Sequence, residues 1–275
     1  MKKYIQYLLK PLKFGAALLL LMFSTTACEQ EIDLELTESE PRLVIEGWVS
    51  TLPGPYEFRV SRSVGFLGNE PQELVSGAVI VVSDDMGNAD TLEEGSPGFY
   101  YTGHLRGAQN HQYFVEVQEG GQTYKASNWM PRIGEIDSSW VTYEPDFVFG
   151  EGYYVNLQAF EPAGVGDFYQ FRLWQNDSLF SAPGDLLVTD DRFVDGQLSP
   201  FLFPSPMEEG DTVVAEVRGI SNLTYDYFIT LFQQASGSGG PFGAPPENLL
   251  TNWDNGALGF FGCGAAQRDT LVVEP

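Results

Sequence analysis

The sequence predicts a mainly β fold, with an N-terminal immunoglobulin-like β-sandwich followed by a second β-rich domain that contains one amphipathic helix. Three observations predict this fold class. Residues 42–130 read as short alternating segments divided by Gly, Pro, Asn and Asp, as strands and their turns do. The β pattern continues beyond residue 131, though less regularly. Residues 223–235 alone place apolar side chains at helical spacing.

The chain begins with the features of an export signal. Four lysines precede an apolar stretch at residues 14–23, which is shorter than the ~20 residues that a membrane-spanning helix needs. Ser24-Thr25-Thr26-Ala27-Cys28 follows, and this order is typical of a bacterial lipoprotein. We therefore predict a signal peptide over residues 1–27 and lipidation of Cys28, which becomes the first residue of the mature protein. The alternative is an ordinary secreted protein with an accidental early cysteine.

Residues 28–40 predict an acidic tether between the lipid and the first domain. Glu29, Glu31 and Asp33 resemble the acidic export signal of Bacteroidota, which sends lipoproteins to the outer face of the outer membrane. Acyl chains hold such a protein on the membrane by burying methylene groups. We therefore expect a lipid-anchored outer-membrane protein that faces the cell surface. A tether that is acidic only because it is solvated is the alternative.

The charge of the chain excludes one class of partner. The formal net charge is −24, and removal of residues 1–27 leaves 10 basic against 38 acidic residues. Such a surface repels phosphate backbones and lacks the basic patch that nucleic-acid binding requires. The charge is compatible with divalent cations, with cationic ligands or simply with solubility, so it selects no ligand.

Residues 41–131 form the predicted sandwich. Its candidate strands are residues 43–49, 56–63, 78–83, 98–102, 111–118 and 122–128, and this number and spacing favour an immunoglobulin-like topology. The acid-rich residues 84–90 lack the spacing of a calcium-binding loop, so a polar turn is favoured there over a calcium site. Residues 119–122, Glu-Gly-Gly-Gln, predict a glycine hairpin turn.

Residues 132–275 form the predicted second domain, after a joint at residues 131–134. Its candidate strands are residues 152–160, 168–174, 212–218, 257–261 and 270–273. Asn222 is placed to cap the helix that is predicted over residues 223–235. The Gly- and Pro-rich residues 236–246 predict a loop, and their lack of lysine excludes a Walker phosphate-binding motif.

The sequence predicts neither an enzyme nor a cofactor. If Cys28 is lipidated, Cys263 has no cysteine partner, and its glycine-rich surroundings predict a small buried residue. The chain has two histidines, no Gly-x-Ser-x-Gly elbow and no His-Glu-x-x-His pair. A glycosidase that uses two carboxylates remains an alternative, with Asp190 and Asp191, or Glu208 and Glu209, as pairs. Adjacent residues of a strand point to opposite faces, which argues against both pairs.

Trp253 is the candidate ligand contact, because it lies between Asn252 and Asp254 near the predicted loop, whereas the other four tryptophans are expected to fill the cores. An exposed tryptophan can stack on a sugar.

Four triplets also resemble the Asp-Ser/Thr-apolar acceptor of Bacteroidota O-glycosylation, although an aspartate turn before a strand explains them better. These triplets begin at Asp90, Asp177, Asp211 and Asp269.

Four stretches of the chain carry a family resemblance: residues 28–34 (CEQEIDL), 41–49 (PRLVIEGWV), 54–62, and 255–261 (NGALGFF). With them the chain resembles a family of Bacteroidota outer-membrane lipoproteins, domain of unknown function 4249, over nearly the whole mature length. The resemblance implies a β-rich lipoprotein encoded beside a TonB-dependent transporter, and it carries no catalytic motif. We therefore expect a non-enzymatic binding or lid-like accessory of such a transporter. A free-standing adhesion or structural lipoprotein is the alternative.

Overall fold

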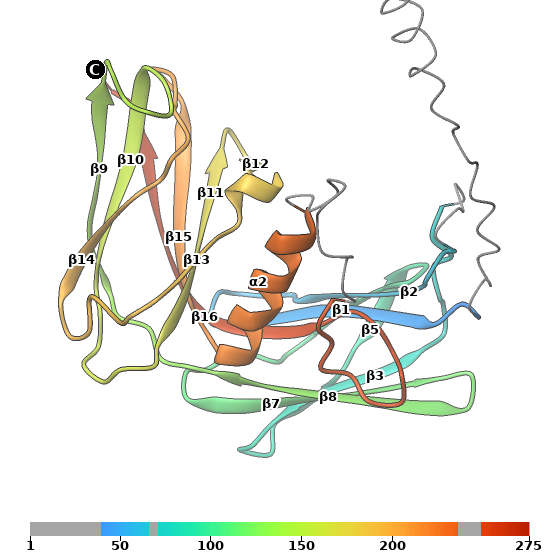
Figure 1. Cartoon of the computed structure of the whole chain (residues 1–275). Helices are drawn as coiled ribbons and strands as arrows, with labels where there is room; N and C mark the ends of the chain where they lie inside the picture. Colours follow the sequence, from blue (N-terminus) through green and yellow to red (C-terminus); the bar gives the residue numbers. More distant parts are fainter. Residues whose placement is uncertain (1–39, 66–70, 236–248, 275) are drawn as a thin grey trace, which may run out of the picture. The chain divides into compact units, whose positions relative to one another are not determined.

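The computed structural model describes residues 40–65, 71–235 and 249–274, which belong to one compact unit (Figure 1). The predicted signal peptide, Cys28 and the acidic residues Glu29, Glu31 and Asp33 lie outside the described residues. So does the loop that the sequence predicts at residues 236–246. None of the helices in the described part is long and apolar enough to cross a membrane.

The fold is mainly β, as the sequence predicts, and its strands form three sheets. The N-terminal strands are β1 (Leu43–Ser50), β2 (Glu57–Arg62), β3 (Val79–Asp84), β4 (Ala89–Thr91), β5 (Glu93–Ser96), β6 (Phe99–Tyr101), β7 (His111–Glu119) and β8 (Gln122–Met130). The remaining strands are β9 (Ile136–Glu144), β10 (Gly152–Phe160), β11 (Phe168–Gln175), β12 (Ser178–Leu179), β13 (Leu187–Asp190), β14 (Leu198–Leu202), β15 (Thr212–Ile220) and β16 (Phe261–Val272). A 3₁₀ turn, η1, spans Pro183–Asp185, and the helix α2 spans Asn222–Ala235.

The largest sheet runs in the order β12-β11-β15-β16-β1-β2-β6-β5, and β13 also pairs with β11. The second sheet, β4-β3-β7-β8, belongs to the N-terminal part, and the third, β14-β10-β9, to the C-terminal part. Side chains of both smaller sheets pack on the large one. Phe201 of β14 stacks on Phe171 of β11 with ring centroids 3.7 Å apart, and Asn128 of β8 donates to the Phe261 carbonyl of β16 at 3.0 Å.

The last strand joins the two parts that the sequence divides near residue 132. β16 is antiparallel to β15 from Thr212↔Val272 to Ile220↔Gly264, and parallel to β1 from Gly47↔Phe261 to Ser50↔Gly264. Figure 1 shows β16 running beside both strands. The sequence predicts two short strands here, whereas the structure has one strand of 12 residues. Strand alternation is a local signal and carries no information on such distant pairing.

The helix lies where its period predicts, but its cap is one residue earlier than predicted. The Ser221 hydroxyl, rather than the Asn222 side chain, accepts the backbone N–H of Thr224 at 3.1 Å. Thr224 is fully buried, and its hydroxyl accepts from the side-chain amide of Asn128 at 2.9 Å. These bonds fix the first turn of α2 on strand β8.

Two turns that the sequence predicts are present. Asp84 Oδ1 accepts the backbone N–H groups of Met86 at 3.0 Å and Asn88 at 2.8 Å, which closes the acid-rich turn between β3 and β4. Gly120 and Gly121 have φ values of 57° and 76°, as the two central residues of a type I′ hairpin require.

Candidate functional site

Three arginines surround one glutamate on one face of the large sheet. Glu216 of β15 has Arg172 of β11 and Arg268 of β16 as its direct cross-strand partners. Arg218 is two residues further along β15 and therefore projects from the same face. We call these four residues the arginine cluster. The sheet register alone brings them together from three strands.

The glutamate is fully buried, and all three arginines contact it. Arg172 Nη1 lies 3.2 Å from Glu216 Oε1, and Arg218 Nε donates to the same oxygen. Arg268 Nε donates to Oε2. The arginine side chains are 22%, 11% and 44% exposed for residues 172, 218 and 268. The cluster thus has one negative charge, on Glu216, against the three positive charges of the arginines. Its net charge is positive, whereas the whole chain is strongly acidic.

Two tryptophans lie beneath these guanidinium groups. The Cζ atoms of Arg172 and Arg268 are 4.5 Å and 4.7 Å from the centre of the Trp174 ring, and that of Arg218 is 4.9 Å from the Trp48 ring. All three distances fall within the range of cation–π attraction. The aromatic faces therefore stabilise charges that Glu216 alone does not neutralise.

A glycine makes room for one of these rings. A Cβ atom at Gly262 of β16 would lie 2.1 Å from ring atoms of Trp48, a separation that no pair of non-bonded carbon atoms tolerates. The glycine-rich stretch around Cys263 thus serves to seat Trp48 against the sheet. The indole Nε1 of Trp48 is buried and has no hydrogen-bond partner among the described residues.

Burial acts on the pKa values of two arginines of the cluster. Burial, together with the neighbouring charges of Arg172 and Arg268, lowers the pKa of Arg218 to about 10, and the Glu216 carboxylate opposes this change. Burial also lowers the pKa of Arg172, against the effect of Glu216. A pKa of about 10 still leaves the guanidinium of Arg218 protonated at pH 7.

A groove of about 380 Å³ adjoins the cluster, between α2, η1 and strands β11 and β12. Arg172, Arg218 and Gln170 form its polar wall. Its apolar wall consists of Leu179, Phe180, Leu186, Phe228, Leu231 and Phe232. The groove thus combines a large apolar surface with two guanidinium groups.

The polar wall has hydrogen-bonding capacity that the described residues leave unused. Arg218 bonds to them through Nε alone, so its Nη1 and Nη2 groups bond to none of them. Gln170 is 6% exposed, and its Oε1 has no partner in the described part of the chain. Gln170 Oε1 is a buried atom without a partner, and such atoms are normally paired. The Nη1 and Nη2 groups of Arg218 are not among the buried unpaired atoms, so a polar ligand in the groove can reach them.

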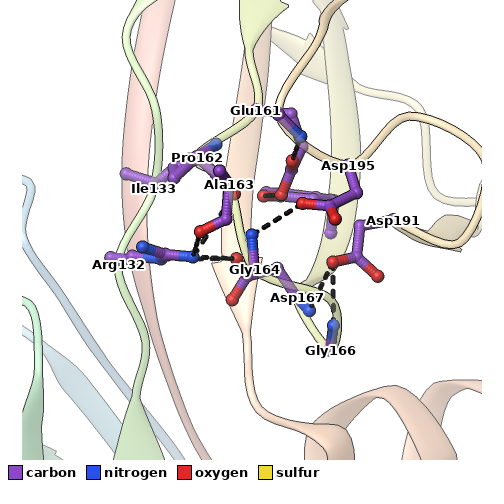
Figure 2. A network of polar contacts seen from close by, with 12 residues as sticks. Arg132, Ile133, Glu161, Pro162, Ala163, Gly164, Gly166, Asp167, Asp191 and Asp195 are labelled. Carbon is purple, nitrogen blue, oxygen red and sulfur yellow. Dashed lines mark hydrogen bonds and ion pairs between the residues drawn. The ribbon is translucent and has the colours of Figure 1, made fainter.

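A second polar network, rich in acids, includes Asp167, the residue that directly precedes β11 (Figure 2). Carboxylate oxygens of Glu161, Asp167 and Asp191 lie within 4.8 Å of one another, and Arg132 Nη2 is 3.0 Å from Asp167 Oδ2. Asp191 Oδ2 accepts the backbone N–H of Asp167 at 3.1 Å. The Tyr169 hydroxyl donates to Glu161 Oε1 at 3.0 Å. These bonds join the residues around the start of β11 to Glu161 and to Asp191, which follows β13.

Burial and repulsion act on one carboxyl of this network. Burial raises the pKa of Glu161, and the carboxylates of Asp167 and Asp191 raise it further, against hydrogen bonds from Gly196 and Tyr169. Glu161 also contributes to an apolar pocket of about 270 Å³, which is otherwise lined mainly by residues such as Phe160, Phe171, Phe193 and Phe201.

The adjacent acids that a glycosidase might use have separate partners. Asp190 Oδ2 pairs with Arg192 Nη2 at 2.8 Å, whereas Asp191 is 1% exposed and accepts backbone N–H groups. The pair Asp190 and Asp191 is therefore not one site, as expected for neighbours in an extended chain.

The structure corrects the expectation for Trp253. This residue is 6% exposed, and its indole N–H donates to the Ile45 carbonyl at 2.9 Å, so it is part of the core. Its polar neighbours are engaged as well: Asp254 Oδ1 accepts from Lys125 N at 2.6 Å, and the Asn252 amide donates to the Phe261 carbonyl at 2.8 Å. Polar flanking residues suggested an exposed position, but they bond to the backbone around Trp253 instead.

Cys263 is a buried core residue, as the sequence predicts. It is fully buried, and burial raises the pKa of its thiol, which suppresses the reactive thiolate.

The hydroxyl residues of the four Asp-Ser/Thr-apolar triplets are exposed and lie on strands: Thr91, Ser178, Thr212 and Thr270. That these triplets are turns before strands, and not sites of O-glycosylation, stays a prediction.

The arginine cluster and its groove are the features that the sequence analysis missed. The one available signal was strand alternation, which places Arg172 with Trp174, and Glu216 with Arg218, on the same faces of two strands. Nothing in the sequence indicates that these two strands, and β16, are neighbours.

Comparisons with known proteins give one extensive match. The model of a family described as "Domain of unknown function (DUF4249)" matches residues 29–270. No curated protein matches the chain.

Two solved structures show weak likeness. A two-domain fibronectin type-III segment of chicken tenascin is 11% identical, with 68% of this chain and 89% of that chain covered and a TM-score of 0.21. A pullulanase from Anoxybacillus sp. LM18-11, complexed with maltotriose, is 12% identical, with 65% and 24% covered and a TM-score of 0.21. Neither likeness carries an argument about this chain.

Proposed function

This chain belongs to the DUF4249 family, and on that premise we propose that it is a lipid-anchored outer-membrane protein that binds a ligand without transforming it. We further propose that it acts as a lid-like accessory of a TonB-dependent uptake system and faces the cell surface. The ligand enters the groove beside the arginine cluster, and a partner barrel performs the transport.

The observation that carries the binding role is the set of unused donors on Arg218 at the wall of an apolar groove. An arginine keeps its proton at physiological pH, so it orients and neutralises a ligand but does not serve as a general acid or base. The chemistry of the polar wall therefore suits recognition better than catalysis.

The proposed anchor is supported by the N-terminal sequence. Small residues precede Cys28, and an acidic stretch that contains Glu29, Glu31 and Asp33 follows it. The family match begins at residue 29, directly after this cysteine. Two or three acyl chains on Cys28 hold the mature protein on the membrane surface.

The proposed partnership is supported by the family resemblance, which implies a gene beside that of a TonB-dependent transporter. It is tested by mild-detergent purification of the tagged native protein from its own outer membrane, with mass spectrometry of whatever stays bound. We expect stoichiometric recovery of a TonB-dependent barrel. Recovery of the lipoprotein alone would contradict the accessory role and favour adhesion or a structural role at the surface.

The matched control for this experiment is the Cys28→Ser variant, produced and purified in the same way. Without the thiol that carries the lipid, this variant is expected to leave the outer-membrane fraction and to lose the barrel. Retention of Cys28→Ser in that fraction would contradict the proposed anchor.

A further inference from the structure

We propose that the groove beside the arginine cluster binds an amphipathic carboxylate, that is, an anion with one carboxylate group and an apolar body. This inference rests on the binding role proposed above and adds the chemical class of the ligand. It follows from the charge of the cluster, from the geometry of Arg218 and from the surface of the groove.

The net positive charge of the cluster favours the binding of an anion in addition to Glu216. Arg172, Arg218 and Arg268 all contact the single carboxylate of Glu216, which is fully buried. The charged groups that act on Arg218 most strongly are these same three neighbours. A largely buried charge is costly unless it is paired, and the Arg218 side chain is only 11% exposed. A ligand carboxylate at this wall therefore neutralises charge that Glu216, alone among the carboxylates of the described residues, pairs with in this cluster.

The geometry of Arg218 favours a carboxylate. Its Nε is taken by Glu216, whereas the Nη1 and Nη2 groups bond to no described residue and Arg218 forms part of the groove wall. Two parallel N–H donors on a planar guanidinium match the two oxygens of a carboxylate. The Trp48 ring, 4.9 Å from Arg218 Cζ, limits the orientations that this guanidinium can take.

The surface of the groove selects an apolar body for the ligand. Phe228, Leu231 and Phe232 of α2, with Leu179 and Phe180, line a volume of about 380 Å³, which is within the ~300–1,000 Å³ of small-molecule sites. Phe232 is 41% exposed, so a ligand that covers it gains hydrophobic free energy.

Asp185 is the one acid among the described residues that line the groove, and its charge restricts the ligand to one carboxylate. Asp185 belongs to the groove, and its Oδ2 accepts the backbone N–H of Ala182 at 2.8 Å, which holds η1 in place. Its negative charge repels a second carboxylate on the ligand. Gln170, whose buried Oε1 is unpaired, offers an acceptor to a ligand hydroxyl or amide.

The test uses three probes with one apolar body and different charge: 4-phenylbutyrate, 4-phenylbutanol and 4-phenylbutylamine. Their binding to the full chain in lipid nanodiscs is measured by calorimetry at neutral pH. We expect the carboxylate to bind at least tenfold more tightly than the alcohol, and the amine to bind more weakly still. The Trp48 and Trp174 fluorescence should change only with the carboxylate.

Two variants locate the binding. Arg218→Gln should weaken 4-phenylbutyrate binding at least tenfold and remain folded, because Glu216 keeps Arg172 and Arg268 as partners. Arg192→Gln makes the same change of charge at an exposed position, 69% exposed, and should bind like the wild type.

The exposed groove residue gives a second test that does not disturb the ion cluster. Phe232→Ser should weaken the carboxylate and the alcohol by the same factor, because it removes apolar surface alone. Unfolding midpoints of each variant, measured in parallel, separate lost binding from lost structure.

The outcomes separate the ligand class from the binding role. Carboxylate-selective binding that Arg218→Gln abolishes and Arg192→Gln leaves intact supports the inference. Equal binding of all three probes, lost in Phe232→Ser but not in Arg218→Gln, overturns the carboxylate while the binding role stands. Binding of no probe overturns both at this groove, and recovery of a barrel from the native membrane reports on the accessory role independently.

Discussion

Replacing Glu216 with glutamine should destabilise the protein more than any other single change of charge in the described residues. The glutamine keeps the shape of the side chain but removes the one negative charge that Arg172, Arg218 and Arg268 share. Breaking a buried ion pair by neutralising one partner costs about 3–5 kcal/mol. For a protein of this size each kcal/mol lowers the unfolding temperature by about 2–4 °C, so we expect a decrease of roughly 6–20 °C.

The assay is thermal and denaturant unfolding of the full chain, followed by circular dichroism. Glu119→Gln is the matched control, since Glu119 pairs with a single arginine, Arg62, at 2.7 Å near the surface, and such pairs contribute ~1 kcal/mol or less. Adding Arg218→Gln to Glu216→Gln should restore part of the loss, because it removes one uncompensated charge. Equal stability of Glu216→Gln and Glu119→Gln would refute the reasoning.

Three further predictions concern other parts of the structure. Trp253→Phe should cost about 1–3 kcal/mol of unfolding free energy in denaturant titrations, because it leaves the Ile45 carbonyl without its donor, and an unchanged midpoint would contradict its place in the core. Burial raises the pKa of Glu161 above its ordinary value of 4.5. The native state therefore binds this proton more tightly than the unfolded state, and the free energy of unfolding should fall as the pH rises from 4.5 through the native pKa. Glu161→Gln should remove that slope in unfolding curves recorded at several pH values, and an unchanged slope would assign it to other groups. Gly262→Ala should destabilise the protein by about 1–3 kcal/mol and shift the tryptophan emission, because its methyl group displaces the Trp48 ring, and wild-type emission would argue against that contact.

Local pattern predicted the fold class and many of the elements. Residues 43–49, 152–160 and 223–235 alternate or repeat at strand and helix periods, and they correspond to β1, β10 and α2. β9 was missed because its polar and apolar residues are all only partly buried or exposed, so its sequence lacks a clear apolar face. Alternation reports burial, and a strand without a fully buried face gives little of that signal.

The candidate site could not be predicted, because its residues meet only through the order of the strands. Arg172, Glu216 and Arg268 lie on three strands that are far apart in the sequence, and each looks like an ordinary solvated charge in its own segment. Trp253 shows the opposite error: polar neighbours suggested exposure, whereas hydrogen bonds from those neighbours to other backbone segments enclose it.

The parallel pairing of the first and last strands imposes an order on folding. β1 and β15 are neighbours of β16 in the finished sheet, so until residues 261–272 are available each presents an unpaired edge. A chain that enters its compartment N-terminus first therefore carries two open strand edges until residues 261–272 arrive, and open edges are templates for aggregation. Closure across more than 200 residues of chain, from Gly47 to Phe261, is also entropically slow. We therefore expect the central sheet to be completed only when β16 pairs with both β1 and β15.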